Sequence, residues 1–120
     1  MANEIYSALT LTARKSGATV TLSNAVNQDM AGSNMIQSTQ LIGTSAELVS
    51  FGDISGAPSQ VMIKNLDSTN FVEIGGDSGL TVFKLKLLAG KHLLLPPSSA
   101  TMYAKADTAN VRIQIVATEL

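Results

Sequence analysis

The stretch VRIQIVA, residues 111–117, decides the fold. Its apolar side chains stand at every second position, with Arg112 and Gln114 between them. Successive side chains of a β-strand point to opposite faces, so this spacing predicts a strand with one face in a core and one face in solvent. We therefore start from sheet structure and ask how far the same pattern extends.

Alternation with the same period recurs along the chain. In residues 80–88, for example, Leu85 and Leu87 point one way, and Lys84 and Lys86 point the other. Segments rich in Gly, Pro, Asn, Asp and Ser separate the runs, and helical spacing is nearly absent. The predicted strands lie at residues 8–13, 18–22, 35–42, 46–51, 60–65, 71–75, 80–88, 91–95, 101–105 and 111–117. About ten short antiparallel strands predict an all-β fold, a β-sandwich or a jelly-roll-like arrangement.

The first two strands are predicted to form a hairpin, because Ser16 and Gly17 mark a turn between them. Residues 24–34 are polar and lack periodicity, so we expect a loop or an extended arm there. Residues 1–10 and 24–34 are not expected to build the core. Both segments are therefore candidates for contact with a partner.

Composition indicates one globular domain over residues 1–120, with 45% hydrophobic and 14% charged residues. Nine acidic and eight basic side chains leave a formal net charge of −1, and no basic cluster occurs. We therefore expect neither nucleic-acid binding nor attachment to a membrane surface. The chain has no cysteine, which excludes thiolate metal sites and thiol nucleophiles. No secretory signal is visible, so we expect a protein made in a cytoplasm.

The motif Gly76-Asp77-Ser78-Gly79 resembles the nucleophile turn of trypsin-like serine proteases. That family continues with another glycine where this chain has Leu80, and its histidine precedes the serine, whereas His92 follows it. Its fold also needs two barrels. A glycine-containing turn between two strands explains the same residues, so we expect no catalysis at Ser78.

His92 is the only histidine, and it lacks a second imidazole or a thiolate with which to bind a transition metal. We expect a structural or partly exposed histidine. Asp67, Glu73 and Asp77 lie on neighbouring turns, where carboxylates cap turns or bind calcium. Capping is the favoured interpretation, and calcium near Asp67 and Asp77 stays open.

Three lysines, Lys84, Lys86 and Lys91, are the candidate partner-contact residues. They either dock on an acidic surface or form an ordinary solvated face. The sequence contains no phosphate-binding glycine loop and no histidine pair, so we expect no cofactor and no enzymatic activity. A small sheet protein without convergent polar residues is more often a binding or structural module.

Five segments of the chain carry a family resemblance. The segments concerned are VMIKNLDSTNFVEIG at residues 61–75, LKLLAG at 85–90, MYAKADTA at 102–109, the opening residues 1–5 and residues 42–47. Together they resemble small proteins encoded among the structural genes of tailed bacteriophages and prophages. Within the first segment, Asn65, Asp67 and Asn70 are expected to bond to nearby backbone and fix a hairpin.

This resemblance implies a component of the virion, assembled in the host cytoplasm. The favoured role is a capsid decoration or cement protein that bridges subunits of the major capsid protein, or binds another virion protein. A homo-oligomer, with a trimer favoured, would match the local symmetry of a shell. The alternatives are a tail, neck or fibre-base component, and a carbohydrate-binding adhesion module, for which the supply of aromatic residues is thin.

Overall fold

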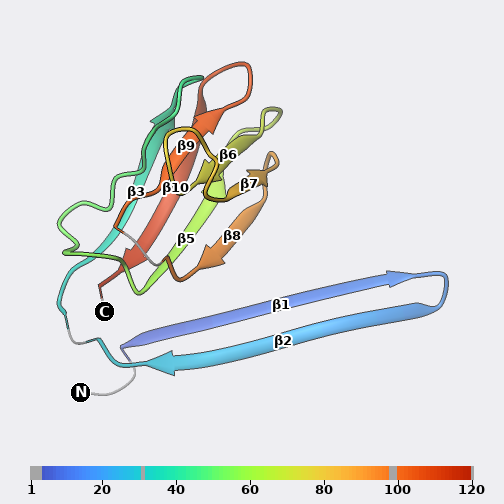
Figure 1. Ribbon diagram of the computed structural model, residues 1–120. Helices are drawn as coiled ribbons and strands as arrows, with labels where there is room; N and C mark the ends of the chain where they lie inside the picture. The colour runs from blue at the N-terminus through green and yellow to red at the C-terminus, as the bar shows by residue number, and fades with distance from the viewer. Residues whose placement is uncertain (1–3, 31, 98–99, 120) are drawn as a thin grey trace. The chain divides into compact units, whose positions relative to one another are not determined.

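The computed structural model describes residues 4–30, 32–97 and 100–119 (Figure 1). All regular secondary structure in these residues is β-strand, which confirms the predicted all-β class. The strands are β1 Ile5–Lys15, β2 Ala18–Gln28, β3 Met35–Ile42, β4 Glu47–Leu48, β5 Gln60–Asn65, β6 Val72–Gly75, β7 Lys84–Leu87, β8 His92–Leu95, β9 Tyr103–Ala106 and β10 Val111–Thr118. Ten strands in the described residues agree with the number that alternation predicts.

Internal contacts divide the chain into two units, residues 1–31 and residues 32–120. The first unit contains the hairpin of β1 and β2, and the second contains the other eight strands. Composition predicted one domain over residues 1–120, and whether the two units fold as one domain stays a prediction.

The second unit has the strand order of a jelly roll. Its sheets have the orders β3-β10-β5-β8 and β4-β9-β6-β7. The first strand of the unit pairs with the last, the second with the seventh, the third with the sixth and the fourth with the fifth, all antiparallel. This is a long antiparallel ribbon folded over on itself, which defines the jelly roll. The predicted β-sandwich or jelly-roll-like fold is confirmed.

A single apolar core lies between the two sheets of this unit. Ile63 comes from one sheet and Val72 and Ile74 come from the other, and all three side chains are fully buried. β10 is central in its sheet, and its apolar residues at alternate positions are buried while Arg112 and Val116 are exposed. The stretch from which the fold was predicted thus forms the middle of the core.

Two strands are shorter than alternation predicts by more than one residue. β4 covers only two residues of the expected 46–51, and β7 begins at Lys84 although the expected strand began at residue 80. In the second case the Asp77 carboxylate accepts hydrogen bonds from the backbone N–H groups of Thr81 and Val82, at 2.6 and 3.0 Å. Those two donors are therefore used by the turn and are not available to a strand.

Of the loop and the extended arm expected at residues 24–34, the loop is wrong for the first part, which is extended. β2 continues through Asn24 to Gln28, and Gln28 pairs with Ile5 at the other end of the hairpin. Backbone hydrogen bonds form between two paired strands whatever their side chains are. Pairing with β1 therefore continues β2 through residues whose side chains do not alternate.

Candidate interaction surfaces

The hairpin of the first unit turns at Ser16 and Gly17. Lys15 pairs with Ala18, and the two residues between them have φ angles of 53° and 82°. Positive φ at both central positions is the type I′ geometry, whose twist matches that of the flanking strands. The predicted turn is confirmed, and it sets the register of all eleven residue pairs of the hairpin.

One face of this hairpin is mainly apolar, and its large apolar side chains are exposed. Residues opposite each other in an antiparallel pair share a face, as Leu11 and Leu22 do here. The large apolar side chains of this face are Leu9, Leu11, Val20, Leu22 and Val26, exposed by 48, 74, 66, 76 and 45%. We call them the apolar hairpin face. No second layer within the unit covers them, because the described part of residues 1–31 has no further strand.

The other face of the hairpin carries mainly hydroxyl side chains. Thr10 and Ser23 form a cross-strand hydrogen bond of 2.9 Å, and Thr21 donates to Thr12 at 3.3 Å. Such threonine and serine pairs stabilise a sheet while leaving the face suited to water. The hairpin is therefore amphipathic, with one polar face and one apolar face.

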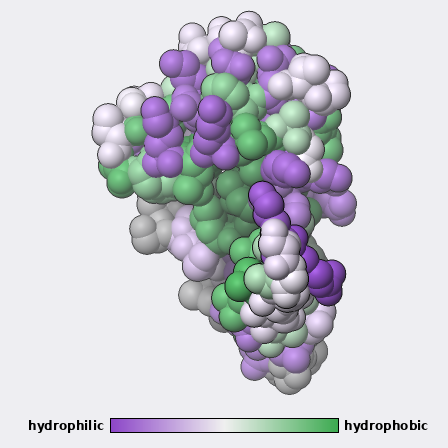
Figure 2. Space-filling model, turned by 90° about the vertical axis from the view of Figure 1, so that its right-hand side faces the viewer, coloured by the Kyte–Doolittle hydropathy of each residue, from purple (hydrophilic) through white to green (hydrophobic). Residues whose placement is uncertain are grey.

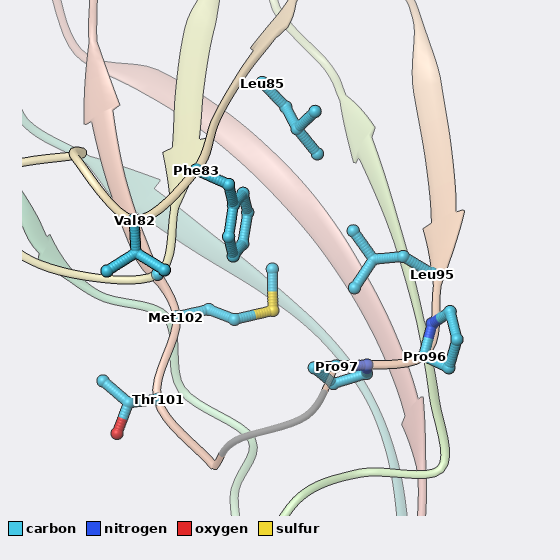
Figure 3. Close-up of a pocket in the computed structure, with 9 residues that line it drawn as sticks. Val82, Phe83, Leu85, Leu95, Pro96, Pro97, Thr101 and Met102 are labelled. Atoms are coloured by element: carbon cyan, nitrogen blue, oxygen red, sulfur yellow. The ribbon is translucent and has the colours of Figure 1, made fainter.

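A second apolar surface lies on the jelly roll, where its two sheets end in β7 and β8. Neither strand has a further neighbour in the sheet orders of the described residues. A recess of about 420 Å³ opens between them, and Figure 3 shows its lining. We call this recess the edge groove. Its large apolar side chains are Val82, Phe83, Leu85, Leu95 and Met102. Figure 2, which faces this side, shows apolar side chains flanked by hydrophilic ones.

Exposure in the edge groove follows from its place at the end of the sheets. Leu85 points toward the core side of β7, as predicted, yet 39% of its surface remains exposed, and Phe83 is exposed by 38%. Val82, in the connection before β7, is exposed by 73%. A side chain at the edge of a sandwich has sheet on one side only, so alternation toward the core does not by itself bury it.

The three predicted contact lysines are spread around β7. Lys84 lies 3.5 Å from Glu73, an ion pair across two strands, and the Lys86 ammonium lies 4.2 Å from the centre of the Phe71 ring. Lys91 is exposed in the turn between β7 and β8. Lys84 and Lys86 thus share the outer face of their sheet, away from the apolar side of β7.

Ser78 lies in a capped turn. The Leu80 N–H donates to the Asp77 carbonyl at 2.9 Å, and Leu80 has a φ of 55°. The Asp77 carboxylate also accepts a 2.7 Å bond from the Thr81 hydroxyl, and these donors, first among them the Val82 amide, hold the pKa of Asp77 below its usual range. Ser78 itself is exposed. Backbone geometry and capping therefore account for the motif.

His92 begins β8, opposite Lys64, and its side chain is exposed. It belongs to one sheet, whereas the turn that carries Ser78 connects two strands of the other.

The turn after β5 is fixed by a buried amide. Asn65 is fully buried, and its side-chain nitrogen donates to the carbonyls of Asn70 and Leu87, each at 3.0 Å. Its side-chain oxygen accepts from the Asp67 N–H at 2.8 Å. The prediction that Asn65 bonds to nearby backbone is confirmed, and Leu87 adds a partner far away in sequence.

Asp67 and Asn70 complete the same turn. The Asp67 carboxylate accepts from the N–H groups of Asn70 and Thr69, at 2.7 and 3.0 Å, which lowers its pKa. The Asn70 side chain differs from its prediction, because its oxygen accepts from the Thr108 hydroxyl at 3.2 Å instead of from backbone. Within the described residues no three His, Asp or Glu side chains gather as a metal site would require. Capping explains the carboxylates at this turn.

Glu119 binds two segments that the sequence did not connect. Its carboxylate accepts from the Ser55 N–H at 2.8 Å, in the loop between β4 and β5, and from the Ser33 N–H at 3.0 Å, just before β3. These bonds, with weaker ones from Asn34, lower the pKa of Glu119. A lone acidic residue after a strand carries no sequence signal for such partners.

Sequence reasoning also missed the two apolar surfaces. Alternation at residues 8–13 and 18–22 shows that the hairpin has an apolar face, but it does not show whether a second layer covers that face. The edge groove joins residues of β7, β8 and the segment before β9, and their proximity follows from sheet order alone.

Comparisons with protein-family models, with curated proteins and with solved structures find no match for the chain. Among the described residues there is also no helix of the length and apolar character needed to cross a membrane. Function is therefore inferred from the two exposed surfaces.

Proposed function

We propose that this chain is a structural protein of a tailed-bacteriophage virion, and specifically a decoration or cement protein on the capsid. The observation that carries the proposal is the apolar hairpin face, with Leu11 and Leu22 exposed by 74 and 76%. An isolated two-stranded hairpin is marginally stable in water. A long hairpin with one apolar and one hydroxyl-bearing face is suited to lying on a protein surface, which is how an assembly protein works.

The fold supports the same proposal by analogy. Jelly rolls recur in viral capsid domains and in lectins. Fold alone does not fix function, so the jelly roll supports the capsid role only together with the surfaces and with the resemblance of residues 61–75 to phage structural proteins. The capsid role takes precedence over a lectin role because the exposed surfaces described above are mainly aliphatic, whereas sugar binding usually stacks on aromatic rings.

Binding in place of catalysis is part of the proposal. Ser78 is exposed in a turn that Asp77 caps, and the edge groove is lined mainly by aliphatic, aromatic and thioether side chains. No cofactor enters the proposed mechanism.

The mechanism would be thermodynamic. A protein that binds the assembled shell and not its free subunits stabilises the shell by mass action. Each copy would bridge neighbouring molecules of the major capsid protein, and several contacts per copy would raise the total affinity above that of one interface. A trimer would match the local threefold symmetry of a shell, and assembly would take place in the host cytoplasm.

The test compares virions made with and without the chain. Particles that lack it should rupture at lower temperature, and adding purified protein should restore the temperature of complete particles. Imaging then separates locations, since regularly spaced density on the shell supports decoration and a ring on the tail axis supports the tail, neck or fibre-base role. Unchanged rupture temperature together with no density on the head would refute the decoration role.

A further inference from the structure

The sheet edges of the jelly roll differ in how they are protected against the addition of another strand. An outermost strand has backbone N–H and C=O groups that no neighbour uses, and proteins blunt such edges with very short strands, lysines or prolines. β4 has only two residues, β7 carries Lys84 and Lys86, and β8 is followed directly by Pro96 and Pro97. These three edges are therefore poor templates for a further strand.

The fourth edge, β3, has none of these features. Its eight residues, MIQSTQLI, include no charged residue and no proline. Met35 and Leu41 are exposed by 69 and 47%, and Gln37 and Thr39 are exposed between them. No strand lies beyond β3 in the sheet order of the described residues, and Figure 1 shows β3 on the side of the jelly roll opposite to β8. β3 is therefore the edge best suited to accept another strand.

The register shows which backbone groups of β3 point outward. The Leu66 N–H donates to the Arg112 carbonyl at 2.9 Å, so even-numbered residues of β10 bond toward β5 and odd-numbered ones toward β3. Ile113 of β10 pairs with Gln40, so even-numbered residues of β3 bond to β10. The N–H and C=O groups of the odd-numbered residues of β3 therefore point away from the sheet, where a further strand would meet them.

The sequence of β3 matches itself when the strand is reversed. In an antiparallel pair centred on Ser38, Met35 of each copy lies opposite Leu41 of the other, and Gln37 lies opposite Thr39. Apolar side chains then meet apolar ones and polar side chains meet polar ones. A shift of two residues would instead place Met35 opposite Thr39, or Leu41 opposite Gln37.

This match has the symmetry of a pair of identical chains. A twofold axis perpendicular to a sheet keeps each face of the sheet on its own side, so outward-pointing residues pair with outward-pointing residues. The register centred on Ser38 meets this condition, because each of its outer-face pairs joins two odd-numbered residues. We infer that two copies of this chain pair through their β3 edges about a twofold axis at Ser38, which joins their two four-stranded sheets into one.

The size of the contact predicts a weak dimer. Residues 35–41 at about 3.3 Å each give a contact about 23 Å long, and one sheet is about 10 Å thick. The two copies together would bury about 500 Å², well below the roughly 1,200 Å² of stable complexes, and would form about eight backbone hydrogen bonds. We therefore expect a dissociation constant of about 10 µM to 1 mM, which is typical of transient pairing.

A strand of a different protein would explain less of the sequence. Such a strand would bond to the same backbone groups, but it would not require β3 to match its own reverse. The inference goes beyond the proposed function, because it concerns a contact between purified copies and needs no capsid. It is also a twofold contact, distinct from the threefold contact of the proposed trimer.

The first experiment traps the pair with a disulfide. Ser38 bonds to β10, so across the axis it forms a non-hydrogen-bonded pair with its own copy, with Cα atoms about 4.5 Å apart, which a disulfide can span. The chain has no cysteine, so Ser38→Cys introduces a single thiol. On oxidation it should give covalent dimers at least about tenfold faster than Ser68→Cys, an exposed serine in the turn after β5.

A neighbouring position tests the register. Thr39→Cys lies opposite Gln37 in the proposed pair, so it should cross-link to itself more slowly than Ser38→Cys. If Ser38→Cys cross-links no faster than Thr39→Cys or Ser68→Cys, the inference is overturned. Docking of a different protein on β3 would give that result, since purified copies would then have no reason to meet at Ser38.

The second experiment blocks the edge without touching the sheet. The Thr39 N–H points outward, so Thr39→Pro removes a donor that β10 does not use. Combined with Ser38→Cys it should reduce the cross-linking rate to that of Ser68→Cys, while the urea midpoint stays near that of Ser38→Cys alone. Thr39→Lys covers the case in which proline prevents folding, because it leaves the backbone unchanged and puts two ammonium groups beside the axis. Undiminished cross-linking in either folded variant would overturn the inference.

Sedimentation of the wild type completes the test. The average mass should rise above the 12.5 kDa of one chain as concentration increases, and Thr39→Pro should reduce that rise. A mass that stays at one chain up to the highest soluble concentration would contradict pairing. Because none of these measurements uses virions, such a result would leave the proposed function standing.

Discussion

Replacing Asn65 with leucine tests the polar network that ties the turn after β5 to the rest of the jelly roll. The side chain is fully buried and makes three hydrogen bonds, to the carbonyls of Asn70 and Leu87 and from the Asp67 N–H. Leucine has a similar size but satisfies none of these groups. At about 1 kcal/mol net for each lost bond, we expect the free energy of unfolding to fall by about 3 kcal/mol.

The assay is urea unfolding followed by circular dichroism, because the chain has no tryptophan to report by fluorescence. With a slope of about 1 kcal/mol per molar urea, the midpoint should fall by roughly 2 to 3 M. The matched control is Asn110→Leu at an exposed position, where the change should stay within about 0.5 kcal/mol.

A second substitution at the same position separates the hydrogen bonds from the packing. Asn65→Asp keeps the oxygen that accepts from Asp67, but it places a carboxylate oxygen against the carbonyls of Asn70 and Leu87. Burial should raise the pKa of that carboxyl, so the destabilisation should grow as pH rises above about 4 and shrink below it. An Asn65→Leu midpoint within 0.5 M of the wild type, or an aspartate variant insensitive to pH, would refute this account of the network.

Three further predictions concern other parts of the chain. The pKa values of Asp67, Asp77 and Glu119 are lowered in the folded protein from ordinary values of 3.8, 3.8 and 4.5, so their contribution to stability is complete above those values and is lost as pH falls through the lowered ones. Thermal unfolding should show a constant melting temperature above about pH 5 and a decline below it, and a flat profile down to pH 2 would contradict the assignment. Gly17→Val puts a branched side chain at a φ of 82°, which should destabilise the hairpin by about 1 to 2 kcal/mol and speed hydrogen exchange of its amides, with no matching change in the jelly roll. Ile113→Ala removes a fully buried side chain from β10 and should cost about 2 to 5 kcal/mol in urea unfolding, whereas Arg112→Ala on the exposed face of the same strand should cost little.

The strand positions were largely predictable because alternation is a local property. β3 and β5 were predicted with the bounds that the structure has, and the capping roles of Asn65 and Asp67 followed from side chains that bond to neighbouring backbone. The predictions failed where a pairing strand or a capping side chain overrode the alternation of the segment itself. Residues 24–28 became strand through pairing with β1, and residues 80–82 left the strand because of the Asp77 carboxylate.

The contact surfaces were less predictable than the strands. Lys84 and Lys86 project outward as expected, and their role as partner contacts stays a prediction. The edge groove could not be foreseen, because its residues come from three separate segments. Glu119 illustrates the same limit, since its partners Ser33 and Ser55 are brought to it only by the folded chain.

By itself, the sequence determined where strands form, which side of each strand is apolar and where the first hairpin turns. Side-chain periodicity and positive φ at Gly17 are local properties that neighbouring residues specify. Only the tertiary structure decided that the eight strands follow a jelly-roll order, that β7 and β8 end the sheets beside each other, and that the hairpin forms a unit of its own with no further strand over its apolar face within the described residues of that unit. Backbone hydrogen bonds are nearly the same for every residue, so a strand's own sequence specifies that it pairs but not with which strand.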